Sequence, residues 1–101
     1  MARPFLRLFA ATWSDDQEVG RWMDAALSAS GADLVGFSVL SEDATVLAFA
    51  IPGDRVPELG SHLQEAPLSL DRISREVIAH WPAADMADVE IRGSIKLTVL
   101  H

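Results

Sequence analysis

The histidines and carboxylates are the residues of this chain whose types could do chemistry. A metal site or a general acid–base pair needs several such groups at convergent spacing, as in the patterns H-x-x-H and H-E-x-x-H. The histidines His62, His80 and His101 stand alone in the sequence. The adjacent acids Glu42 and Asp43 fall where a hairpin turn is expected, so we interpret them as solvated turn residues. The spacing therefore predicts neither a metal site nor a catalytic pair of carboxylates.

Motifs for nucleophilic catalysis and for nucleotide binding are also missing. The stretch Gly36-Phe37-Ser38-Val39 lacks the G-x-S-x-G pattern of hydrolase nucleophiles. The glycines never follow the spacing G-x-G-x-x-G or G-x-x-x-x-G-K-S/T. The chain has no cysteine, which excludes disulfides and thiolate metal sites. We therefore predict a protein that is not an enzyme, has no cofactor and works by binding a protein partner.

Length and charge narrow the class of protein further. A chain of 101 residues fits one domain spanning residues 1–101. The formal net charge is −7 and the eight basic residues are dispersed, whereas nucleic-acid binding needs a clustered basic footprint. The longest apolar run, Val46 to Pro52, is much shorter than the ~20 residues that cross a bilayer. We expect a cytoplasmic protein that binds neither nucleic acid nor a membrane.

Hydrophobic periodicity predicts the elements that must position any binding residue. Alternation predicts strands and 3.6-residue spacing predicts helices, in the order strand 4–13, helix 15–30, strand 33–40, strand 45–51, helix 54–66 and strand 89–99. Residues 68–81 fit either a helix or a strand. We favour a helix that Ser69 or Asp71 starts and that ends before Pro82. Gly20 lies inside the first helix, where it suggests close packing against another backbone or simple tolerance.

The order of elements predicts an α+β domain with a ferredoxin-like β-α-β-β-α-β sheet and an extra helix or strand before the last strand. In that topology the first and third strands are central, and the second and last are edges. The third strand is apolar on both faces, as a central strand should be, whereas the last strand has one polar face.

A sheet with helices on one face leaves the outer face of its central strands uncovered. Either residues 68–81 fold back over that face, or the domain dimerises there, or the face binds a partner. Two tryptophans at the ends of elements are further candidates, with core packing as the alternative for each. The predicted partner-binding residues are Val46, Ala48, Ala50, Leu68, Leu70, His80, Trp81 and Trp13.

Four stretches of the sequence form a recognisable pattern: the strand and Pro-Gly step of residues 43–54, the Pro-Leu-Ser-Leu-Asp-Arg-Ile stretch at 67–73, and the stretches at 78–83 and 94–99. These stretches resemble the small coupling or effector proteins of bacterial multicomponent diiron monooxygenases. In the last part of the pattern, His80 and Trp81 stand where the family has Ser and Phe, and the family's glycine is absent. The resemblance implies a cofactor-free regulatory protein that docks on the hydroxylase and modulates its turnover. A monomer is then expected, and a homodimer is the alternative.

Two other functions start from the same fold. Residues 32–63 look like an ACT-type regulatory module, which would bind a small molecule near residues 13–16 as a homodimer. A small cofactor-free ferredoxin-like dimeric enzyme is the third possibility. That enzyme would need a polar group inside a pocket, and the sequence identifies none.

Overall fold

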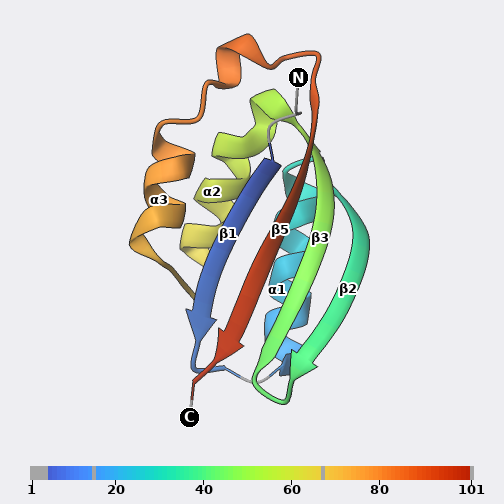
Figure 1. The fold of residues 1–101 in the computed structure, drawn as a ribbon, viewed down its shortest axis with the longest axis vertical. Helices are drawn as coiled ribbons and strands as arrows, with labels where there is room; N and C mark the ends of the chain where they lie inside the picture. The colour runs from blue at the N-terminus through green and yellow to red at the C-terminus, as the bar shows by residue number, and fades with distance from the viewer. Residues whose placement is uncertain (1–4, 15, 67, 101) are drawn as a thin grey trace.

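The computed structural model describes residues 5–14, 16–66 and 68–100 of an α+β chain with a mixed sheet (Figure 1). The elements in chain order are β1 (Phe5–Thr12), α1 (Asp16–Ala29), β2 (Asp33–Ser41), β3 (Ala44–Pro52), α2 (Val56–Glu65), β4 (Ser69–Leu70), α3 (Arg72–Ala79) and β5 (Glu90–Val99). Two short 3₁₀ turns, η1 (Gly53–Arg55) and η2 (Ala83–Asp85), connect them. The predicted α+β class and the predicted hairpin are confirmed.

The sequence did not decide between a helix and a strand for residues 68–81, and the structure contains both in this segment. Ser69 and Leu70 form the two-residue strand β4, and the helix begins directly after Asp71. The Asp71 carboxylate accepts a hydrogen bond of 2.7 Å from the backbone N–H of Ser74, which is the N-cap arrangement that starts a helix. The favoured helix is therefore confirmed, with Asp71 as its cap.

This cap gives a prediction with a pH dependence. Hydrogen bonds from the Ser74 hydroxyl and from its backbone N–H hold the pKa of Asp71 below the ordinary value of 3.8. The carboxylate therefore stabilises the fold above that ordinary value, and its contribution is lost as the pH falls through the lower pKa of the folded state. We expect Asp71→Ala to lower the free energy of unfolding by about 1 kcal/mol at neutral pH.

Urea unfolding at neutral pH and near the lower limit of the folded range measures this effect. The difference between Asp71→Ala and wild type should shrink at the acid pH, because the wild-type side chain is then protonated. Asp54→Ala is the control, since no side-chain cap bond starts its turn. An equal loss for Asp71→Ala at both pH values would show that the charge of the cap does not matter.

The order of strands differs from the ferredoxin-like prediction. The sheet runs β2-β3-β5-β1-β4, with β5 parallel to β1 and antiparallel to β3. The second strand lies at an edge, as predicted. The prediction that the last strand is an edge is wrong, because β5 separates β1 from β3. The short strand β4 takes the edge position beside β1.

The packing of β5 explains its central position. One face of this strand is buried from Ile91 to Leu97, with Ile91 and Ile95 fully inaccessible to solvent. Gly93 in the middle lets the ring of Phe49 on β3 and the carbonyl oxygen of Leu6 on β1 approach closely from both sides. The last strand was predicted to be an edge because every second residue of β5 is polar. A polar face reports which side of the sheet is uncovered, and it does not report whether a strand has one neighbour or two.

The helices occupy one side of the sheet. Figure 1 shows α1 and α2 behind β1, β5 and β3, and the core lies between these two layers. Helix α3 lies beside β1, where the Ser74 hydroxyl accepts a hydrogen bond of 2.8 Å from the backbone N–H of Phe9. The possibility that residues 68–81 cover the outer face is therefore wrong, because their strand and helix extend the edge of the sheet. Among the described residues, no helix crosses that face.

Candidate interaction surfaces

The side of the sheet that faces away from α1 and α2 is called the open face below. The strand register places its residues in rows across β3, β5 and β1. Ala50 pairs with Arg92, which pairs with Phe5, and one row further Ala48 pairs with Ser94 and Ser94 with Arg7. The next rows join Val46, Lys96 and Phe9, and then Ala44, Thr98 and Ala11.

Aromatic and basic side chains alternate on the β1 and β5 half of the open face. Phe5 and Phe9 are 53% and 40% exposed, which is unusual for large apolar side chains in a sheet. The guanidinium of Arg7 lies 5.7 Å from the centroid of the Phe5 ring, within the range of a cation–π contact. Arg92 and Lys96 lie directly across from Phe5 and Phe9. In a chain of net charge −7, this face therefore gathers Arg7, Arg92 and Lys96, together with the acid Glu90, whose Oε1 lies 3.7 Å from Nε of Arg92.

The β3 half of the open face holds three of the predicted partner-binding residues. Val46, Ala48 and Ala50 lie in one line along β3, next to the small residues Gly36 and Ser38 of β2. They are half-buried or buried between the neighbouring strands and form a flat surface. The sequence predicted one apolar surface on the outer face of the first and third strands. This surface is not continuous, because β5 lies between β3 and β1 and places polar and basic residues there.

The other predicted residues do not join this face. Leu70 is buried in the core, and Leu68 and Trp81 pack against the core. The indole Nε1–H of Trp81 donates a hydrogen bond of 2.8 Å to the carbonyl oxygen of Gly53, so this side chain anchors the loop after β3. His80 is exposed at the C-terminal end of α3.

Trp13 is the most exposed of the three tryptophans. It is 74% accessible to solvent and follows the end of β1. It lines a shallow hollow with Leu68 and Ser69, whereas Trp81 lies near Gly53 at the opposite end of the sheet. The structure therefore separates the two tryptophans that the sequence placed in one partner surface.

The aromatic and basic residues of the open face were not among the predicted partner-binding residues. A signal for them exists in the sequence, because Phe5, Arg7 and Phe9 alternate with buried leucines. Arg92 and Lys96 alternate in the same way along the last strand. Only the pairing of β5 with β1 brings the two sets together, and this pairing joins residues more than 80 positions apart.

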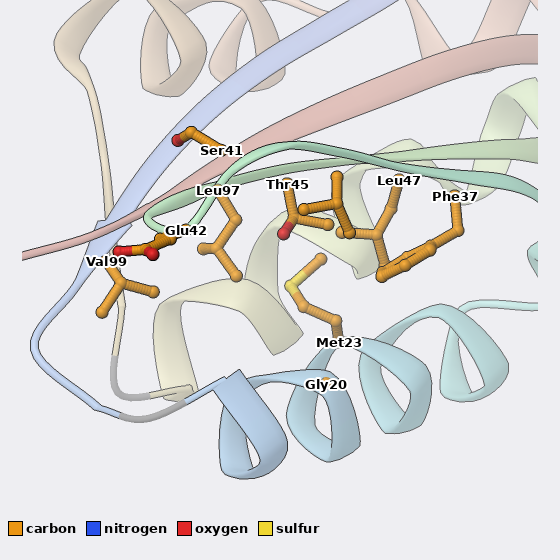
Figure 2. A pocket seen from close by; sticks show the side chains of 10 residues that line it. Gly20, Met23, Phe37, Ser41, Glu42, Thr45, Leu47, Leu97 and Val99 are labelled. Carbon is orange, nitrogen blue, oxygen red and sulfur yellow. The ribbon is translucent and has the colours of Figure 1, made fainter.

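A second surface feature lies between α1 and the β2–β3 hairpin, and it is called the side groove below. It is a hollow of about 220 Å³ (Figure 2). Met23 of α1 and Leu47 of β3 line it from the core side, and Phe37 closes one end. Gly20 of α1 also lines it, so the helix presents no side chain at that point. The polar residues around the groove are Ser41, Glu42 and Thr45.

These features carry no recognisable catalytic arrangement. Among the described residues, no group of three or more His, Asp and Glu side chains could hold a metal ion. Within the same ranges, every buried side-chain nitrogen or oxygen has a hydrogen-bond partner. Asp71, whose pKa is lowered, is exposed and caps α3.

No protein-family model, curated protein or solved structure matches the chain. None of the described helices is both long enough and apolar enough to span a membrane. The composition and geometry of the two surfaces are thus the basis for a functional proposal.

Proposed function

We propose that this domain is a non-catalytic regulatory protein that binds a partner enzyme through its open face and modulates the turnover of that enzyme. One observation carries the proposal: in an acidic chain, the open face combines the exposed Phe5 and Phe9 with Arg7, Arg92 and Lys96. Phenylalanine and arginine are both enriched at protein interfaces. The two phenylalanines are the anchors, and the basic residues set the orientation.

The charge distribution supports a specific kind of partner surface. A partner with a recess for the two aromatic rings and acidic residues around it complements the open face. The other faces of this chain carry most of its negative charge and are repelled by such a partner. Only one orientation then brings opposite charges together, which favours a single mode of docking.

The resemblance to effector proteins of multicomponent diiron monooxygenases makes the hydroxylase of such a system the first partner to test. The open face supports docking, and the resemblance alone supports the identity of the partner. A turnover assay of a cognate hydroxylase with this chain in stoichiometric excess tests the identity. An unchanged rate together with no complex would reject this partner.

Point variants test whether the open face is the docking surface. We expect Phe9→Ala to weaken binding to the partner about tenfold or more, because a partly exposed aromatic anchor is lost. Arg7→Glu should slow association and reduce its dependence on ionic strength, because attraction turns into repulsion. Binding is measured by surface-based kinetics at several salt concentrations.

Ile73→Ala is the matched control for these variants. Ile73 is 68% exposed on α3, away from the open face, so its truncation should leave affinity unchanged. If Ile73→Ala weakened binding and Phe9→Ala did not, the docking surface would be α3 and the proposal for the open face would be wrong.

A further inference from the structure

The outer edge of β2 is a second surface of unusual composition. Within the described residues, β2 pairs only with β3, so the backbone groups on its other edge face outward. No charged residue or proline occurs between positions 34 and 41. Charges and prolines are the usual devices that prevent an edge strand from pairing with another chain. Five large apolar side chains of β2 are between 47% and 64% exposed: Leu34, Val35, Phe37, Val39 and Leu40.

The side groove runs next to this edge, and Gly20 holds it open. A Cβ atom built on Gly20 would meet no described atom within 4 Å. Packing within the chain therefore does not require glycine here, although glycine lowers the helix propensity of α1 relative to alanine. The missing side chain leaves space beside Phe37, which lines the groove together with Gly20. This space suits a side chain that enters from outside the chain.

We propose that a second copy of this chain occupies the β2 edge and the side groove. The two β2 strands pair antiparallel about a two-fold axis close to Phe37, which extends the sheet across both copies. A two-fold axis perpendicular to the sheet keeps the helices of both copies on the same side. The apolar residues of β2 in one copy then contact the apolar residues of β2 in the other copy. Each Phe37 ring reaches the side groove of the other copy.

The charges of the strand favour a second copy as the occupant. With Phe37 opposite itself, residue 33 lies opposite residue 41, so Asp33 meets Ser41 and no second carboxylate. Within residues 33–41, two copies therefore place no two carboxylates directly opposite each other. Glu42, which lines the groove and follows Ser41, is the nearest carboxylate to Asp33 of the other copy. Arg21 and Asp24, which have opposite charges, line an adjoining hollow that shares Gly20, Phe37 and Leu47 with the side groove.

The exposed side chains of β2 supply part of the area that a dimer needs. An aromatic side chain has roughly 150–250 Å² to bury, so Phe37, at 64% exposure, contributes on the order of 100–160 Å². The four aliphatic side chains, each exposed by about half, add to this area. A standard interface buries about 800 Å² per partner. The strand edge and the walls of the groove supply the remainder. Two β-bulges, at Val35 and at Leu40, limit the regular ladder to the residues between them, so apolar contact carries much of the interface.

Analytical ultracentrifugation over a concentration series tests the proposal on the full chain. Wild type should sediment as a dimer of the 11.0 kDa chain. Phe37→Lys should weaken the dimer about tenfold or more, because a lysine on an edge strand blocks strand pairing. Phe5→Lys is the matched control: Phe5 has a similar exposure on the open face, and its replacement should leave the dimer intact.

Gly20→Leu is a second variant that does not depend on β2. Its side chain has free space in the single chain and fills the side groove, so the fold should persist while the dimer weakens. Circular dichroism verifies the fold of each variant. A wild type that stays monomeric at ~1 mM has a dissociation constant above that concentration, and this result overturns the proposal. A dimer that Phe5→Lys disrupts and Phe37→Lys does not would place self-association on the open face and overturn it as well. If the dimer proposal fails, docking through the open face can still be tested. The docking variants at Phe9 and Arg7 share no residue with the dimer variants.

Discussion

Replacing Phe49 with alanine is expected to lower the free energy of unfolding by about 3–5 kcal/mol. Phe49 is the largest fully buried side chain of the described residues and is 1% exposed. It lies on β3, on the face that packs against the helices, and its ring covers Gly93 of the adjacent strand. The loss combines the transfer of the ring from water with the cavity that the truncated side chain leaves.

The size of this effect is large for a domain of this length. At roughly 0.05–0.15 kcal/mol per residue, a chain of 101 residues has a total stability of about 5–15 kcal/mol, so this single substitution removes a large fraction of it. Urea unfolding followed by tryptophan fluorescence measures the change. Phe5→Ala is the matched control, because the same replacement removes a ring that is 53% exposed and lies outside the β2 edge. We expect its cost to stay within about 0.5 kcal/mol, as for most surface substitutions. Equal losses for both variants would show that Phe49 is not the centre of the core.

Gly93→Ala is expected to cost about 1–3 kcal/mol through overpacking. A Cβ at position 93 would lie 2.7 Å from Cζ of Phe49 and 3.0 Å from the carbonyl oxygen of Leu6. The ring can move slightly, but the carbonyl belongs to the paired strand β1 and cannot move without disturbing the sheet. The same urea titration measures this loss.

Gly36→Ala provides the control for backbone effects of the same substitution. A Cβ there would lie 3.5 Å from Cβ of Ala48, which is ordinary van der Waals contact. We expect no loss, and a gain of up to about 1 kcal/mol, because alanine reduces the freedom of the unfolded chain.

A double variant separates the two neighbours of Gly93. In a Phe49→Leu background, the ring no longer opposes the new methyl group, so Gly93→Ala should cost less than in wild type. Contacting residues typically show a coupling of about 0.5–3 kcal/mol. Strictly additive costs would instead identify the Leu6 carbonyl as the source of the clash.

The position of β5 links stability to the proposed function. Its buried face, with Gly93 at the centre, joins β1 and β3 into one sheet. Its opposite face places Arg92 and Lys96 beside Phe5 and Phe9 on the open face. The same strand therefore holds the core together and supplies two of the basic residues proposed for docking.

The sequence by itself determined the local structure of this protein. The alternation of residues 33–40 and 45–51 predicted the hairpin, and Gly31 ends α1 with the positive φ of 73° that a left-handed cap requires. Of the two residues proposed to start the third helix, Ser69 and Asp71, Asp71 is the cap, whereas Ser69 lies in β4. These features depend on backbone geometry within a few residues, so the pattern of neighbouring side chains is sufficient to predict them.

Only the tertiary structure decided which strands are neighbours and which residues share a surface. The partner residues proposed from sequence divided accordingly: Val46, Ala48 and Ala50 lie on the open face, whereas Leu70 is in the core and Trp81 anchors a loop. The position of β5 depends on packing between segments far apart in the chain, such as Phe49 against Gly93. Periodicity contains no information on such pairs, because the same alternation fits a strand with one neighbour or with two.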